Sequence, residues 1–219
     1  NVRMEQINDD ALWNLMEALV KEGKVRSYGA ALGPAIGWLY EGGECVQKRN
    51  PHIVQHIYNM LEPHPGRQMM DDALEKGDRR TAYLIRVTHS SGMLEGHYTE
   101  DTVFGENDHR RHRPRSWLIN GSKKVDRLKE FLVNPDRTLG QAALQWLLAD
   151  KRVAVCLPNI YEEGHMKEFA ETSECPPLTP DDMSRITELQ KINFGVDEAP
   201  PKYKGTMSRE PETAAALSS

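Results

Sequence analysis

The chain has 219 residues, of which 38% are hydrophobic and 28% charged, and its formal net charge is −5. This composition is typical of a soluble globular protein, and the negative charge argues against general affinity for nucleic acid or acidic membranes. No run approaches the roughly 18 apolar residues of a membrane span. An odd number of cysteines without motif spacing favours reduced thiols in the cytoplasm: Cys45, Cys156 and Cys175. Because the chain begins without methionine, we expect it to be part of a longer protein.

Segments with helical spacing of apolar residues alternate along the chain with short apolar runs. Helices are predicted at 9–22, 35–48, 66–77, 123–132, 138–149 and 179–193. Strands are predicted near 25–30, 53–59, 82–88 and 154–158. The long segment 89–122 is polar, and residues 199–219 lack periodicity, which predicts a flexible tail.

The clearest unit is 138–159. Its first half carries an apolar helical stripe, with Thr138 as the expected N-cap: Leu139, Ala142, Ala143, Trp146 and Leu147. Three charged residues then break the pattern, and the run from Val153 to Leu157 is apolar without alternation. Such a run predicts a strand that is covered on both faces, as in a parallel sheet.

Four strands alternating with helices predict an α/β fold with parallel strands joined by right-handed crossovers. The spacing of roughly 30 residues per unit matches a (β/α)₈ barrel, which needs about 250 residues for eight units. The sequence therefore predicts a partial TIM barrel of four β/α units.

Four segments, in order and spacing, resemble the C-terminal half of the aldo-keto reductase family. They correspond to the family's fifth strand, its sixth strand, its seventh strand with a Gly-x-Leu-x-Gly loop, and its seventh helix with the eighth strand: GKVRSYGAALGP, IVQHIYNMLEP, RVTHSSGMLEGHYTEDT and TLGQAALQWLLADKRVAVCLPN. The resemblance covers about residues 9–195. It implies that 1–198 form the C-terminal half of a (β/α)₈ barrel.

The resemblance also implies an oxidoreductase that reduces small aldehydes or ketones with NADP(H). The family's catalytic Asp, Tyr, Lys and His lie on its first four strands, so no catalytic residue is predicted in this chain. We expect a cofactor-binding half that is inactive alone and that pairs with an N-terminal half-barrel or with itself, because unpaired sheet edges and an apolar face need a partner. The alternative is a non-catalytic barrel remnant that acts as a binding or assembly subunit.

Cofactor contacts are implied at the ends of three strands. Gln55 matches the glutamine that binds the nicotinamide carboxamide, since an amide offers both donor and acceptor; otherwise it caps a strand end. Arg86 matches a residue beside the nicotinamide ring, where a guanidinium can stack; otherwise it forms an interior ion pair. The other candidates lie in loops that commonly hold phosphate in TIM barrels: Val87, Thr88, Ser90, Gly92, Leu94, Pro158, Asn159, Tyr161, His165, Met166 and Phe169.

Two departures from the family pattern bear on the cofactor. Ala31 and Leu32 replace a Ser-Asn pair that would contact the carboxamide. Glu162 and Glu163 lie where basic or amide side chains usually hold the adenosine phosphate. Because acidic side chains oppose a 2′-phosphate, NAD or no cofactor stays open beside NADP.

The segment from His109 to Arg115, HRRHRPR, holds four arginines and two histidines. Its arginines would bind an anionic substrate group or phosphate, or pair with the acidic residues just upstream: Glu100, Asp101, Glu106 and Asp108. Without interleaved aromatic residues it is weak evidence for nucleic-acid binding. The histidines show no recognised ligand spacing, so no metal site is predicted.

Overall fold

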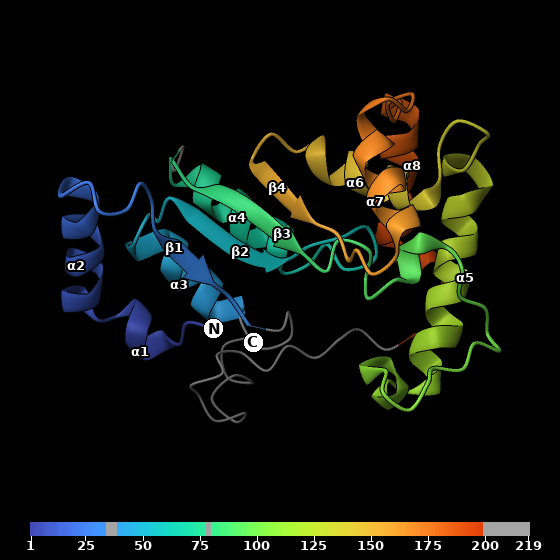
Figure 1. Cartoon of the computed structure of the whole chain (residues 1–219), viewed down its shortest axis with the longest axis horizontal. Helices are drawn as coiled ribbons and strands as arrows, with labels where there is room; N and C mark the ends of the chain where they lie inside the picture. The colour runs from blue at the N-terminus through green and yellow to red at the C-terminus, as the bar shows by residue number, and fades with distance from the viewer. Residues whose placement is uncertain (34–38, 78–79, 199–219) are drawn as a thin grey trace.

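The computed structural model describes residues 1–33, 39–77 and 80–198, so the predicted tail at 199–219 and the start of the helix predicted at 35–48 lie outside the described residues. Its strands form one sheet in the order β1-β2-β3-β4, and every neighbouring pair is parallel (Figure 1). The strands are β1 (Gly29–Ala31), β2 (Ile53–Ile57), β3 (Ala82–Arg86) and β4 (Val153–Leu157). The predicted α/β architecture with parallel strands is confirmed, and this strand order is consistent with a (β/α) barrel.

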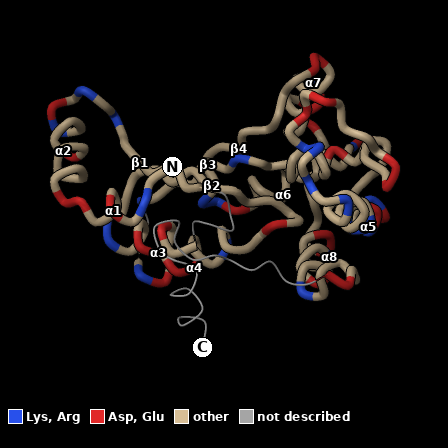
Figure 2. Tube along the Cα trace, turned by 90° about the horizontal axis from the view of Figure 1, so that it is seen from below, with Lys and Arg blue, Asp and Glu red and all other residues tan. Residues whose placement is uncertain are grey.

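Helices cover one face of the sheet and lie beyond both of its ends. Figures 1 and 2 show α3 (Leu39–Lys48), α4 (Gly66–Glu75) and α6 (Leu139–Leu148) on one face. The remaining helices lie at the two ends of the sheet: α1 (Met4–Ile7) and α2 (Asp10–Lys21) near β1, and α5 (Arg115–Leu132), α7 (Glu163–Ala170) and α8 (Pro180–Lys191) beyond β4. Within the described ranges, none of these helices combines the length and apolar character needed to cross a membrane.

The core lies between the sheet and the helices that cover it. Alternate residues of β2 and β3 point into it and are almost fully buried: Val54, His56, Tyr83 and Ile85. Val54, Tyr83 and Ile85 join the cluster that contains Met69 and Met70 of α4 and Trp146 and Leu147 of α6. Thr138 caps α6 as predicted, because its hydroxyl accepts the N–H of Gln141, whose side chain in turn accepts the N–H of Thr138.

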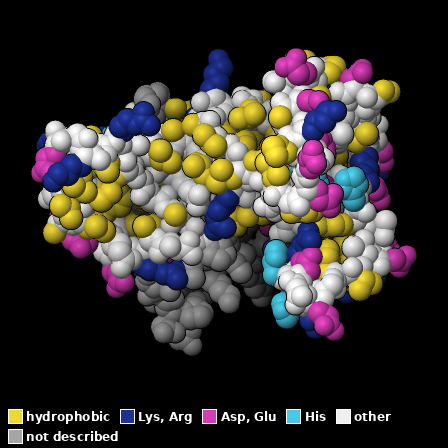
Figure 3. Space-filling view, viewed as in Figure 1, with side chains coloured by type: hydrophobic (Ala, Val, Ile, Leu, Met, Phe, Trp, Pro, Cys, Tyr) yellow, Lys and Arg dark blue, Asp and Glu magenta, His cyan; other side chains and the backbone are white. Residues whose placement is uncertain are grey.

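The opposite face of the sheet is uncovered by any described helix. Ile53, Gln55 and Ile57 of β2 and Leu84 and Arg86 of β3 are only half-buried there. On β4, Val155 and Leu157 are 44% and 41% exposed, and Figure 3 shows hydrophobic side chains gathered over the strands of this face.

The prediction that β4 is covered on both faces is therefore wrong. Only Val153 is buried in this strand. The register shifts between Tyr83 and Leu84, whose partners on β4 are Val153 and Val155, so Ala154 is an extra residue. A continuous apolar run indicates that neither face of a strand is polar, but burial depends on what packs there.

Several element boundaries also differ from the predictions. The strand predicted at 25–30 is only Gly29–Ala31, and those predicted to 59 and 88 end at 57 and 86. The helix predicted at 123–132 begins at Arg115, after Pro114 as N-cap. α1 and α7 were not predicted. The start of α5 was not predicted because its first residue is Arg115, and a basic residue is unfavourable at the positive end of a helix dipole.

Candidate functional site

The loop after β3 is built from residues in left-handed conformations. Val87 has φ 57° and ends the strand, and Ser90, Ser91 and Gly92 follow with φ 49°, 59° and 91°. A Cβ at Gly92 would lie 2.4 Å from the Tyr98 hydroxyl, so only glycine fits there. The loop therefore turns sharply at the carboxyl end of the sheet, next to the uncovered face.

Gln55 and Arg86 lie on that uncovered face. Gln55 is paired with Ala31 and Leu84, whereas Arg86 is paired with Ile57 and Leu157. The Gln55 side chain has no hydrogen-bond partner among the described residues and is free to pair with another amide.

The Arg86 guanidinium is held by main-chain carbonyl groups. Its Nη2 atom donates to the carbonyl oxygens of Leu32 at 3.2 Å and Gly33 at 3.0 Å, and burial lowers its pKa. No carboxylate of the described chain pairs with Arg86, so the interior ion pair offered as its alternative role is not observed there. The Arg86 guanidinium therefore places a positive charge on the uncovered face, and its other N–H groups remain as donors there.

The loops after β3 and β4 meet and form one site. The Thr88 hydroxyl lies 3.5 Å from the carbonyl oxygen of Leu157. The ring of Phe169 stacks between His89, at 4.6 Å between centroids, and His165, at 5.5 Å. The Tyr161 hydroxyl donates to Glu95 at 2.6 Å.

The candidates named from the sequence thus occupy one edge of the sheet, but they differ in exposure. Ser90, Leu94, His165 and Phe169 are buried, and Gly92 and Thr88 are also covered. Tyr161 and Met166 are more than half exposed, Asn159 is exposed, and Val87 and Pro158 are half-buried. No described hydrogen bond links Asn159 or Met166 to the loop after β3. These two residues lie near the other candidates only because they are close to them in sequence.

Glu95 belongs to this site, although the sequence reasoning missed it. Its side chain is 3% exposed and receives the Tyr161 hydroxyl on Oε2, while Nε2 of His165 lies 3.9 Å from the same oxygen. The other oxygen, Oε1, is buried without a hydrogen-bond partner. Burial and the Glu95 carboxylate raise the pKa of Tyr161. The available signal was an acidic residue inside the Gly-x-Leu-x-Gly string, between glycine and apolar residues.

These residues fit the nicotinamide end of a dinucleotide better than a 2′-phosphate. Gln55 offers an unpaired amide and Arg86 a planar cation beside it on the same face. Near the loop after β4, by contrast, Glu162 and Glu163 begin α7, and the Glu95 carboxylate accepts the Tyr161 hydroxyl. Carboxylates at a helix N-terminus neutralise the positive dipole that would otherwise attract phosphate.

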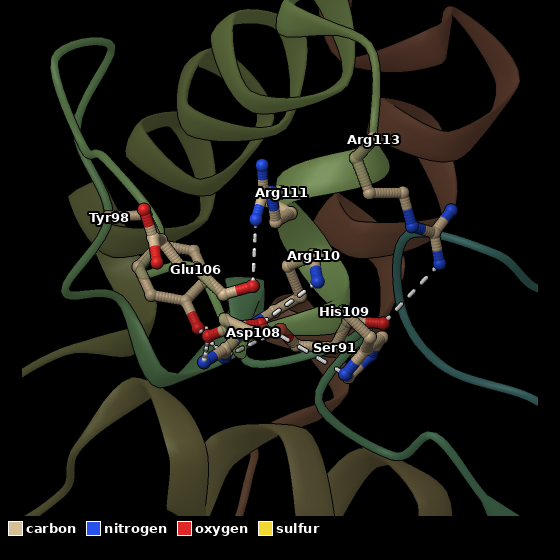
Figure 4. A network of polar contacts seen from close by, with 8 residues as sticks. All are labelled: Ser91, Tyr98, Glu106, Asp108, His109, Arg110, Arg111 and Arg113. Carbon is tan, nitrogen blue, oxygen red and sulfur yellow. Dashed lines mark hydrogen bonds and ion pairs between the residues drawn. The ribbon is translucent and has the colours of Figure 1, made fainter.

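The arginine segment folds against the loop after β3 (Figure 4). Arg110 binds both oxygens of Asp108, with Nε 2.8 Å from Oδ1 and Nη2 2.5 Å from Oδ2, and this contact lowers the pKa of Asp108 to about 2. Arg110 also contacts the Tyr98 hydroxyl. Arg113 lies over the Trp117 ring, 5.1 Å from its centroid. The arginines Arg110 and Arg113 are thus engaged in contacts within this chain.

Pairing with the upstream acidic residues is observed in part. Besides the pair formed by Asp108, Arg115 lies 3.9 Å from Asp101. Glu100 and Glu106 contribute main-chain carbonyl groups, to Arg115 and Arg111. Over residues 1–33, 39–77 and 80–198, no group of three potential ligands could hold a metal ion.

Comparison with known proteins agrees with the fold. The model of the aldo/keto reductase family matches residues 4–191. Aldo-keto reductase AKR11C1 from Bacillus halodurans, in its apo form, is 20% identical, with a TM-score of 0.56 over 84% of this chain and 58% of that one. Its holo form gives a TM-score of 0.57, also at 20% identity, over 84% of this chain and 57% of that one.

The glycerol dehydrogenase AKR11B4 from Gluconobacter oxydans is 16% identical, with a TM-score of 0.67 over 88% of this chain and 59% of that one. This chain therefore spans 57–59% of the length of these three solved structures. No curated protein matches it. The structural likeness shows the fold, and the match to the family model over most of the sequence shows that the chain belongs to the aldo/keto reductase family.

Proposed function

We propose that this chain is the cofactor-binding half of an NAD(P)H-dependent carbonyl reductase, the C-terminal half of a (β/α)₈ barrel, and that it is inactive alone. The observation that carries the proposal is the uncovered face of the sheet. It presents Gln55 and Arg86 beside the loops after β3 and β4, at the carboxyl edge where TIM-barrel enzymes place their active sites.

In this proposal each residue has a task in positioning. The Gln55 amide donates to and accepts from the nicotinamide carboxamide. Arg86, held in place by the carbonyl groups of Leu32 and Gly33, presents the flat side of its guanidinium to the ring. The main-chain N–H groups of Ser91 and Gly92 face the phosphates, whereas that of Ser90 donates to the carbonyl oxygen of Val87. Bound NAD(P)H would supply the hydride for a small aldehyde or ketone, and the proton donor would come from the other half of the barrel.

We further propose that NAD is preferred to NADP. Glu95, Glu162 and Glu163 place three carboxylates around Tyr161 and the N-terminus of α7. A 2′-phosphate near them would meet repulsion, whereas a ribose hydroxyl would find acceptors.

Fluorescence titration of the purified chain with NADH and NADPH tests both points. We expect NADH to bind more tightly than NADPH, and Gln55→Ala to weaken NADH binding about 10-fold, because two neutral hydrogen bonds contribute roughly 1 kcal/mol or more. The matched control is Gln68→Ala, at an exposed position of α4. Equal losses in both variants, or no loss in either, would remove Gln55 from the site.

The uncovered apolar face also supports the proposal that this chain binds a protein partner. An exposed sheet face favours association, as do two edge strands, β1 and β4, that pair with no further strand among the described residues. We propose that the partner is an N-terminal half-barrel or a second copy of this chain. Native mass spectrometry at micromolar concentration separates these cases. A folded monomer that persists at all concentrations excludes self-association.

One observation favours a second candidate, a non-catalytic binding or assembly subunit. The hydrogen bond between Tyr161 and Glu95 bridges the loops after β3 and β4, where the dinucleotide is proposed to pass. A chain that assembles but binds neither nucleotide would support this alternative.

A further inference from the structure

A cavity of about 440 Å³ lies outside the sheet face, between the loops after β2 and β3, α5, and the segment that follows α8. Its size falls in the range of small-molecule sites, which is about 300–1,000 Å³. Leu61, Met93 and Trp117 supply apolar walls, and Glu62, Lys124 and Asn193 supply charged and polar groups.

The carboxylate of Glu62 is fixed in position by two neighbouring side chains. Its Oε2 atom accepts from Nδ2 of Asn59 at 2.9 Å and from the hydroxyl of Ser90 at 3.0 Å. Asn59 is fully buried, and its own Oδ1 accepts the N–H groups of Leu61 and Glu62 at 3.0 and 2.9 Å. The carboxylate is therefore held rigidly by neutral donors.

The second oxygen of Glu62 is left for a ligand. No donor among the described residues binds Oε1, and no Lys, Arg or His there forms an ion pair with Glu62. Among the described lining residues only Lys124 carries an ammonium group, and this group is paired with Glu198 at 2.8 Å. Across the part of the lining that the structure describes, one negative charge is therefore left uncompensated.

Asn193 supplies a further acceptor to the described lining. Asn193 uses its Nδ2 to donate to the carbonyl oxygen of Val196 at 3.0 Å, which leaves its Oδ1 unpaired. Burial acts to raise the pKa of the Glu198 carboxyl, but the contact with Lys124 outweighs it and the pKa is lowered. A ligand that satisfies Glu62 and Asn193 together must bring several donors and a positive charge.

The apolar side of the cavity is kept open by a glycine. A Cβ at Gly121 would lie 2.4 Å from Cε of Met93, so a larger residue would displace the Met93 wall. Trp117, one turn before Gly121 in α5, also lines the cavity. The guanidinium of Arg113, which is not part of the lining, lies over its ring. The walls thus fit a compact apolar group.

We propose that this cavity binds a primary organic ammonium with a compact apolar body, its –NH₃⁺ group donating to Oε1 of Glu62. An ammonium has three donors and no acceptor, which complements this lining, and a hydrogen bond to a carboxylate in a partly desolvated site is stronger than a neutral one. The proposal does not depend on nucleotide binding.

Isothermal titration calorimetry of the full chain tests it with 2-phenylethylamine at pH 7, compared with phenylacetate, which has a similar body and the opposite charge. We expect saturable binding of the amine at millimolar concentration or below and at least 10-fold weaker binding of phenylacetate. Glu62→Gln keeps the shape of the side chain and removes the charge, so amine binding should fall about 10-fold to 100-fold. The matched control, Glu75→Gln at an exposed position of α4, should bind like the wild type.

A second variant keeps the test independent of the Glu62 contacts. Leu61→Trp fills the cavity from a half-buried position and should abolish amine binding while circular dichroism and the thermal midpoint stay near those of the wild type. The proposal is overturned if the folded wild type does not bind the amine, if phenylacetate binds equally well, or if Glu62→Gln binds as tightly as the Glu75→Gln control.

Discussion

Replacement of Asn59 by alanine should loosen the carboxyl edge of the sheet, because this side chain ties two loops together. Asn59 is 0% exposed. Its amide donates to Glu62 at 2.9 Å and to the carbonyl oxygen of Val87 at 3.0 Å, and its oxygen accepts two main-chain N–H groups. Asn59→Ala removes all four bonds at once.

The size of the effect follows from these bonds. Each neutral bond contributes about 1 kcal/mol, and the bond to the Glu62 carboxylate contributes about 1.5–3 kcal/mol. Water that enters from the neighbouring cavity would replace some of the lost hydrogen bonds, so we expect the free energy of unfolding to fall by about 3 kcal/mol. That is a large share of the roughly 5–15 kcal/mol by which a domain is stable.

Urea unfolding followed by circular dichroism measures this loss. With a slope of about 2 kcal/mol per molar urea, the midpoint should fall by about 1.5 M. Asn159→Ala, at an exposed position without described side-chain bonds, is the matched control and should change stability by less than about 0.5 kcal/mol. If the two variants unfold at the same urea concentration, the Asn59 side chain does not hold the loops and the reasoning fails.

Three further predictions concern titration and reactivity. Burial lowers the pKa of His89 to about 4, whereas its value in the unfolded chain is about 6.5. The contribution of neutral His89 to the free energy of unfolding should therefore be complete above pH 6.5 and fall by about 3 kcal/mol toward pH 4. In urea unfolding, His89→Gln should lose less stability than the wild type over this pH range. Arg110 lowers the pKa of Asp108 to about 2, so this pair should persist as pH falls below 4 and be lost near pH 2; NMR titration of the Asp108 carboxyl checks it, and a midpoint near 4 would contradict it. Burial raises the pKa of Cys45 to about 12, so iodoacetamide should label Cys175 in the native chain and Cys45 only after unfolding, as read by peptide mass spectrometry.

Much of the fold could be predicted because its strands and helices are local patterns. The stripe from Leu139 to Leu147 and the apolar run from Val153 to Leu157 mark α6 and β4 without knowledge of their neighbours. The ends of the strands could not be predicted in the same way. Val87 leaves the strand at φ 57°, and the Asn59 side chain takes the next N–H groups beyond β2. Both features depend on how the two loops pack together.

In the candidate site, too, local sequence patterns predicted some residues, and contacts between distant segments determined the others. Gln55 and Arg86 share a face because parallel register and a period of two residues place them there. Glu95 was missed because its burial and its bond to Tyr161 arise between residues 66 positions apart. The exposure of Val155 was also missed, because an apolar residue does not reveal whether a partner covers it.

Carbonyl reduction by the purified chain tests the central claim most directly. The claim is that this sheet supplies cofactor contacts but no proton donor. With NADH or NADPH and a panel of small aldehydes and ketones, the chain alone should bind nucleotide yet show no carbonyl-dependent oxidation of it. Steady turnover that co-purifies with this polypeptide, in the absence of a second chain, would contradict the account.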